Sequence, residues 1–182
     1  MPQFVIGRHA RSAVIWSALA AFLAAGFLVR SAARGETMTR KPTTIAVADF
    51  DYRDTSGESR DQKNEHETRL RNFMQALRSD LEKSGVYNVV ALECGAEPCS
   101  ALRLTPEELF EATRKAGARL LLFGGFHKMS TLVQWAQAQV IDVEKNVVID
   151  DRHLSFRGDS DEAWRRAEAF IAKKLNAEPL PN

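Results

Sequence analysis

The chain has 182 residues, and its 25 lysines and arginines nearly balance 24 acids, for a formal net charge of +1. Without residues 1–35, which hold four arginines and no acid, the net charge is −3. A mildly acidic remainder of ~147 residues fits one domain with one core, and it lacks the basic surface of a nucleic-acid-binding protein.

The N-terminus has the layout of an export signal. Residues 13–29 form an apolar run without charges, Arg8 and Arg11 precede it, and small residues follow at 31–33. A cleaved signal peptide is the first interpretation, and an uncleaved membrane anchor with its N-terminus inside is the alternative. Both place the rest of the chain outside the cytoplasm, either periplasmic or secreted, or anchored in the inner membrane and facing the periplasm. The expected organisation is a signal or anchor at 1–35, a linker at 36–42, an α/β domain at 43–176 and a flexible tail at 177–182.

The first half of the domain alternates strand and helix patterns. Residues 43–50 are a short apolar run that is typical of a buried strand. Residues 51–65 are polar and acidic, which predicts a loop that runs into a helix. Apolar side chains then recur at helical spacing over residues 70–81, and Gly85 ends this helix. The next apolar run, at 86–92, predicts the second strand.

Both cysteines of the chain, Cys94 and Cys99, lie in the loop after this strand. In an exported protein, two cysteines at so close a spacing predict a disulfide. A ring of this size stabilises by only about 2 kcal/mol in the chain-entropy model, so it would shape a loop more than hold the fold. A redox pair and a metal site are the alternatives, but the spacing is not Cys-x-x-Cys and no histidine lies nearby in sequence.

The second half of the domain begins with a strong helix signal. Thr105, followed by a proline and then by Glu108, predicts a capping box, and Gly117 ends the helix. The apolar residues 120–126 predict a third buried strand.

A hairpin and a last helix complete the domain. Residues 131–142 alternate between two faces, and residues 146–156 form the returning strand. Asp159, with Glu162 three residues later, predicts the capping box of the last helix, and Trp164 begins its inner stripe.

The resulting element order is β-α-β-α-β-β-β-α. Because helices join the first three strands, these strands should be parallel, with right-handed crossovers. If the first strand lies between the second and third, the two connecting helices cover opposite faces. The hairpin then extends the sheet antiparallel. We therefore predict an α/β fold, a three-layer sandwich with a mixed five-stranded sheet of order 2-1-3-4-5.

Several segments also carry a family resemblance. Residues 45–50 (IAVADF), 84–85 (SG) before a Val-Val strand and 116–125 (AGARLLLFGG), in this element order, resemble the N-terminal-domain fold of the periplasmic translocation protein TolB. They are similar too to envelope domains of curli secretion lipoproteins and penicillin-binding-protein activators. Residues 140–148 and 156–164 resemble an uncharacterised family of small exported alphaproteobacterial proteins. The resemblance extends over about residues 43–175, and it implies a non-catalytic interaction module of the cell envelope.

In an open parallel sheet, ligands bind at the carboxyl edge where the strand order reverses. Here that edge would carry acids after the first strand, glycines and a histidine after the third, and a histidine from the first helix. Such a cluster suits a divalent cation or acid and base chemistry, and the alternative is a solvated acidic loop with Asp49 capping turn amides. No spacing matches a metal motif, so we predict neither a metal nor a cofactor. The candidate ligand residues are Asp49, Asp51, Asp54, His66, Gly124, Gly125 and His127.

Gly124 and Gly125 are not a phosphate-binding loop, because the spacing is wrong and a hairpin strand follows. A close backbone approach or a bulge explains them better. Trp135, Gln137 and Gln139 share one strand face and are candidates for a partner-binding surface. The interpretation that we favour for this tryptophan is that the last helix covers it.

No complete set of nucleophile, base and orienting group is present in the sequence, so we predict no catalytic residue. The prediction is an exported non-enzymatic module of the cell envelope that binds a periplasmic or envelope protein, or a small ligand, at the strand-edge cleft. The alternative is a periplasmic metal-dependent or hydrolytic enzyme that uses Asp49, Asp51, His66 and His127. Nucleic acid is not an expected partner, and a membrane is one only through an uncleaved N-terminal anchor.

Overall fold

The computed structural model describes residues 41–177 and residue 180. The predicted signal or anchor at residues 1–35 therefore lies outside the described residues, as does most of the linker. Within the described part of the chain, no helix is both long enough and apolar enough to span a bilayer.

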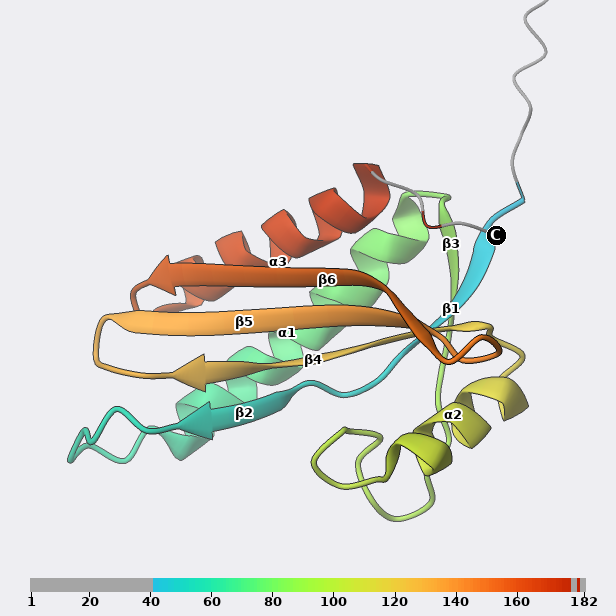
Figure 1. The fold of residues 1–182 in the computed structure, drawn as a ribbon. Helices are drawn as coiled ribbons and strands as arrows, with labels where there is room; N and C mark the ends of the chain where they lie inside the picture. Colours follow the sequence, from blue (N-terminus) through green and yellow to red (C-terminus); the bar gives the residue numbers. More distant parts are fainter. Residues whose placement is uncertain (1–40, 178–179, 181–182) are drawn as a thin grey trace, which may run out of the picture. The chain divides into compact units, whose positions relative to one another are not determined.

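Three helices and six strands make up the domain, and the helices flank a mixed sheet on both faces (Figure 1). This arrangement confirms the predicted α/β class with helices on either side. The elements are β1 (Thr43–Val47), β2 (Asp51–Asp54), α1 (Lys63–Lys83), β3 (Tyr87–Val90), α2 (Pro106–Lys115), β4 (Leu120–Lys128), β5 (Val133–Asp142), β6 (Val147–Arg157) and α3 (Asp161–Ala177).

The main path of the sheet is β3-β1-β4-β5-β6, which matches the order predicted for five strands. Strands β3, β1 and β4 are parallel, and β5 and β6 continue the sheet antiparallel. The prediction lacked a sixth strand, because residues 51–54 form β2 and not a loop. β4 extends past the end of β1, and its free backbone groups pair with β2 from Gly125 to Lys128. Backbone pairing therefore overrides the low strand propensity of the aspartates in this segment.

Two hydrophobic cores hold the layers together. The larger core lies between the sheet and the pair α1 and α3, and it includes Leu77, Leu81 and Ile171, each wholly buried. Leu180, beyond the end of α3, also packs into this core. The smaller core lies on the other face under α2 and includes Leu109 and Leu121. The sheet edge after β1 is thus enclosed by α1 on one side and by the segment leading to α2 on the other.

Of the two predicted capping boxes, the one at the start of α2 is present and the one at the start of α3 is not. Thr105 and Glu108 form the predicted capping box of α2. At α3 the residue that caps the helix is Ser160, whose Oγ accepts a hydrogen bond from the backbone N–H of Ala163 at 3.3 Å. The prediction that Asp159 caps this helix is therefore wrong, because its carboxylate is used in a buried ion pair described below.

Candidate functional site

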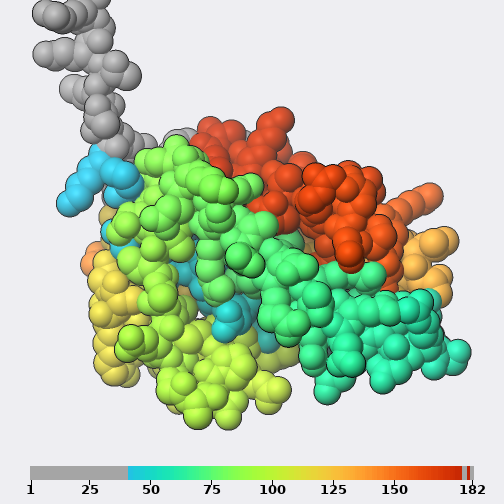
Figure 2. All heavy atoms as spheres, turned by 180° about the vertical axis from the view of Figure 1, so that it is seen from behind, coloured from blue at the N-terminus to red at the C-terminus, as the bar shows by residue number. Residues whose placement is uncertain are grey.

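An open groove of about 1050 Å³ lies at the carboxyl end of β1. Its floor is the segment 49–52, one wall is α1, and the other wall is the segment 98–103 that leads to α2. Figure 2 shows the face where this groove opens, with atoms from the start of the domain visible between those of α1 and those of the segment before α2. This is the place where the strand order reverses, as the sheet topology predicts for a ligand site.

Covalent and backbone bonds hold the second wall of the groove in place. Cys94 and Cys99 form the predicted disulfide. The carbonyl oxygen of Cys99 accepts a hydrogen bond from the N–H of Asp49 at 2.8 Å, and the N–H of Leu102 donates to Oδ2 of Asp51 at 3.1 Å. The wall is therefore fastened to the floor at two points, which positions the side chains between 98 and 103 before any ligand arrives.

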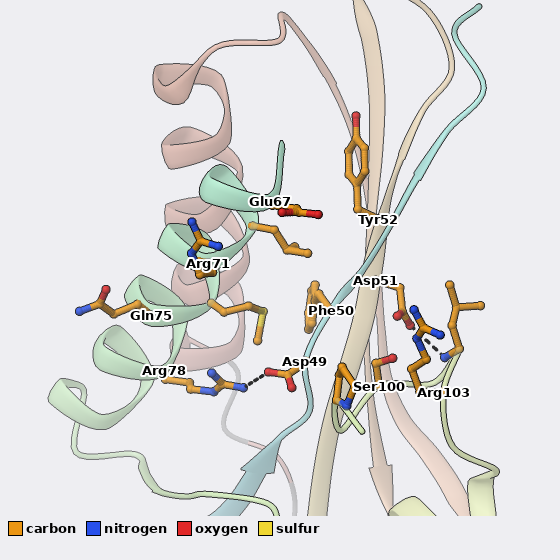
Figure 3. A pocket seen from close by; sticks show the side chains of 14 residues that line it. Asp49, Phe50, Asp51, Tyr52, Glu67, Arg71, Gln75, Arg78, Ser100 and Arg103 are labelled. Carbon is orange, nitrogen blue, oxygen red and sulfur yellow. Dashed lines mark hydrogen bonds and ion pairs between the residues drawn. The ribbon is translucent and has the colours of Figure 1, made fainter. Parts of the chain in front are cut away.

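Three arginines and three acids line the groove, and two of the arginines are not compensated by a carboxylate of the described residues. Nη2 of Arg78 donates to Oδ1 of Asp49 at 2.8 Å, so these two charges compensate one another (Figure 3). Arg71 on α1 and Arg103 on the opposite wall have no carboxylate partner among the residues that the structure describes. Leu102, next to Arg103 in the second wall, is 73% exposed.

A hydroxyl group is also left without a partner in this wall. Ser100 is 2% exposed, and its Oγ makes no hydrogen bond within the described part of the chain. Ser100 lines the groove, and buried hydroxyl groups are usually hydrogen-bonded, so this one is an exception in the wall.

His66 does not reach the groove. It is buried, and its Nε2 donates to Oδ2 of Asp159 at 2.8 Å. The same carboxylate oxygen accepts from Nζ of Lys128, which is wholly buried and also contacts Glu58. Burial alone would raise the pKa of Asp159, but hydrogen bonds from Lys128 and His66 lower this pKa to about 2. His66 is thus part of a structural ion-pair network.

Asp54 belongs to the edge of the same network. Its Oδ1 accepts from the N–H of Ser56 at 2.8 Å, and its Oδ2 lies 3.9 Å from Nζ of Lys128. Partial burial opposes ionisation, but the bonds from Ser56 and the charge of Lys128 lower the pKa of Asp54. This carboxylate therefore stays ionised as a loop and network residue.

The two glycines and His127 have other roles. A Cβ on Gly124 would lie 2.0 Å from the carbonyl oxygen of Gln137, and one on Gly125 would lie 2.9 Å from that of Asp51. The close backbone approach that the sequence suggested is therefore what the structure shows. His127 lies on the sheet face opposite to Lys128, because neighbours in a strand alternate, and its Nε2 is 2.7 Å from Oγ1 of Thr55.

Of the seven candidate ligand residues, only Asp49 and Asp51 line the groove at the end of β1. The acid-and-histidine cluster of the enzyme hypothesis is not assembled, since His66 on α1 is buried against Asp159 and His127 lies on the other face of the sheet. The described residues also contain no group of three or more histidine, cysteine, aspartate and glutamate side chains that could hold a metal ion.

The strand face with Trp135 is more open than expected. Trp135 is 51% exposed, and its cross-strand neighbours are His127 and Ser155. The expectation that the last helix covers it is wrong, because α3 packs on the other face, where Trp164 stacks on Phe126 at 4.2 Å between ring centroids. Gln137 and Gln139 lie on the same face as Trp135, and Nε2 of Gln137 donates to Asp151.

Sequence reasoning missed some residues that the structure makes prominent. Arg71, Ser100 and Arg103 gave no signal, because they have no motif and come together only through the fold. Glu168 is 4% exposed inside the apolar stripe of α3. Its position four residues after Trp164, on the same helix face, was a signal that could have been noticed.

Fold and groove define a class of protein: a three-layer α/β domain with an open groove at the switch point of its sheet. The chain belongs to the DUF3280 family, described as "Protein of unknown function (DUF2380)", whose model matches residues 43–175. A comparison with curated proteins finds no match.

Solved structures of similar fold come from several bacteria. The PelC dodecamer from Paraburkholderia phytofirmans is 15% identical, with 78% of this chain and 91% of that chain aligned at a TM-score of 0.50. The LpoB C-terminal domain from Salmonella enterica is 18% identical over 63% and 82% of the two chains, with a TM-score of 0.43. TolB from Acinetobacter baumannii is 14% identical over 78% of this chain and 29% of that chain, with a TM-score of 0.44. The likeness to PelC concerns the fold alone.

Proposed function

We propose that this protein is a non-enzymatic module of the cell envelope that binds a segment of a periplasmic protein in the groove at the end of β1. The observation that carries this proposal is the exposed Leu102, whose backbone is bonded to the floor of a groove that is also lined by two arginines without carboxylate partners in the described part of the chain. An apolar side chain that is exposed and already ordered costs little conformational entropy when it is buried by a partner.

The charges of the groove indicate the chemistry of the partner. Arg71 and Arg103 lie on opposite walls of the groove (Figure 3). A segment bound in the groove would therefore have a carboxylate for each of them. Arg78 is already compensated by Asp49 and would add little. The partner segment is therefore expected to have an apolar residue flanked by acidic residues, and its affinity should fall with added salt.

The location in the envelope rests on two features of the sequence. The apolar run at residues 13–29 with its preceding arginines is the pattern of an export signal. The pairing of Cys94 and Cys99 suits an oxidising compartment. A fusion of residues 1–40 to a reporter that is active only outside the cytoplasm should be active, and an inactive fusion would overturn the envelope assignment.

The groove is tested by site-specific photocrosslinking in the native cell. A crosslinking amino acid at Leu102 or at Gln75 in the groove should capture one defined protein, whereas the same group at the exposed Lys173 on α3 should not. The captured protein is then purified, and its affinity for this protein is measured directly.

Charge reversal supplies the matched control. Arg71→Glu with Arg103→Glu should weaken binding to the purified partner at least tenfold. Lys83→Glu with Lys173→Glu makes the same change of net charge away from the groove and should leave the affinity within about twofold. Equal weakening by both pairs would show that the groove is not the binding site.

A further inference from the structure

A second cavity lies between α1 and α3, on the side of the domain that packs against the larger core. It has a volume of about 240 Å³, with Phe73 and Ala76 of α1 on one wall and Trp164 and Glu168 of α3 on the other. None of its lining residues lines the groove at the end of β1, so the two sites are separate.

Two buried polar atoms of this cavity lack hydrogen-bond partners. Trp164 is 2% exposed and Glu168 is 4% exposed, yet Nε1 of the indole and Oε1 of the carboxyl group make no hydrogen bond within the described residues. Most buried polar groups in folded proteins are paired. A cavity with a mostly apolar surface and a few polar groups is the usual composition of a small-molecule site.

The surroundings of Glu168 favour a cation. Burial and the nearby carboxylate of Asp80 raise the pKa of Glu168 to about 7, and among the described residues no arginine forms an ion pair with this group. Arg69, which also lines the cavity, donates at 2.8 Å both to Asp159 and to Asp161. Arg165, at the mouth of the cavity, is paired with Glu162 on the solvent side of α3. Both arginines that line the cavity are therefore paired with other acids and not with Glu168.

We propose that the cavity between α1 and α3 binds a small primary amine with an apolar body. The ammonium group would donate to Glu168. The body would pack against Phe73 and Trp164, whose rings meet edge to face at 6.4 Å between centroids, so it would lie beside this pair and not between the two rings. The cavity holds the volume of roughly eight water molecules at ~30 Å³ each, which suits a body of one aromatic ring. Such a ring, or an oxygen on it, would accept the indole N–H.

The test uses phenethylamine as the probe and the purified exported protein. Its titration at pH 8 should shift the indole N–H resonance of Trp164 to saturation. Glu168→Gln should weaken phenethylamine binding at least tenfold, while binding of 2-phenylethanol, which has the same shape and no charge, should change less than threefold. The exposed Glu111→Gln on α2 is the matched control and should bind like the unmodified protein.

A variant that fills the cavity tests whether both probes bind in the cavity and not elsewhere on the protein. Ala76→Leu should reduce the binding of both probes, and circular dichroism should show that each variant is folded. The proposal is overturned if phenethylamine gives no saturable shift at millimolar concentration, if Glu168→Gln binds it equally well, or if phenylacetate binds as tightly. Because the groove residues are unchanged in these variants, the outcome is independent of partner binding at the groove.

Discussion

Oδ2 of Asp159 accepts a hydrogen bond from Nζ of Lys128 at 2.8 Å, although the lysine side chain is wholly buried. The other oxygen of this carboxylate, Oδ1, accepts from Nη1 of Arg69 and from Nε2 of Gln134. One aspartate thus ties α1, β4 and β5 to the loop before α3. A buried ion pair adds little net stability compared with apolar packing, but removal of one partner leaves the other charge uncompensated.

Asp159→Asn should therefore destabilise the domain by about 3–5 kcal/mol, because Lys128 and Arg69 lose their shared counter-charge. Asp161→Asn is the matched control, since Asp161 also pairs with Arg69 but its side chain is 89% exposed, so its loss should cost about 1 kcal/mol or less. Urea unfolding at pH 7 measures both. Equal losses in the two variants would contradict a special role for the buried pair.

The stabilisation from Asp159 should also disappear in acid. Its pKa is about 2 in the folded protein and near the ordinary value of 3.8 in the unfolded chain. A lowered folded pKa gives stability that is present above the unfolded pKa and is lost as the pH falls through the folded value. At about 1.4 kcal/mol per unit this amounts to roughly 2 kcal/mol between pH 5 and pH 2. The difference in unfolding free energy between the unmodified protein and Asp159→Asn should therefore narrow by this amount over this range.

Ionisation of Glu168 should lower the stability of the folded protein, and this effect should appear at higher pH than that of Asp159. The folded pKa of Glu168, about 7, exceeds the ordinary value of 4.5, so its contribution to stability is complete below pH 4.5 and is lost as the pH rises through 7. Glu168→Gln should therefore be about 3 kcal/mol more stable than the unmodified protein at pH 8 and nearly equal at pH 4. Thermal unfolding across this range is the measurement. A constant difference at all pH values would mean that Glu168 is not titrating in this interval.

The two glycines of β4 should tolerate an added methyl group very differently. Gly124→Ala places its Cβ 2.0 Å from the carbonyl oxygen of Gln137 and 2.8 Å from the ring of Phe50, so β4 and β5 must separate. We expect a loss of about 3 kcal/mol or more, or failure to fold. Gly125→Ala places its Cβ 2.9 Å from the carbonyl oxygen of Asp51, which is a smaller overlap, and should cost about 1–2 kcal/mol. Soluble yield and urea unfolding rank the two, and a reversed order would refute the packing explanation.

The strand order was predictable because each apolar run and each helix stop has a local cause. The strand β2 was not predictable. Its aspartates are typical of a loop, and its formation depends on pairing with the end of β4, which the local sequence does not show. The wrong prediction that Asp159 caps α3 has a similar cause. Aspartate is a good capping residue, and the local sequence does not show that its carboxylate pairs with a buried lysine 31 positions away.

The candidate site was predictable in place but not in composition. The switch point follows from strand order, so the position of Asp49 and Asp51 could be predicted. The burial of His66 could not be predicted. The apolar stripe places His66 on the inner face of its helix, but it does not show whether this part of the face is open to the groove or covered. The spacing of Glu168 from Trp164 places it on the inner face of α3, but an acid near an apolar stripe is usually solvated, and the packing of α3 on α1 is needed to show that this one is enclosed.

The disulfide is expected to order the groove wall and to be dispensable for the fold. Cys94→Ser with Cys99→Ser should cost about 2 kcal/mol, because a ring closed over a separation of five residues removes little entropy from the unfolded chain. The N–H of Leu102 still donates to Asp51 without it, so the wall should loosen but stay attached. Amide hydrogen exchange should then speed up at Leu102 and remain unchanged at Leu77 in the core of α1. A double variant that is unfolded at room temperature would show that the bridge contributes far more than its ring size allows.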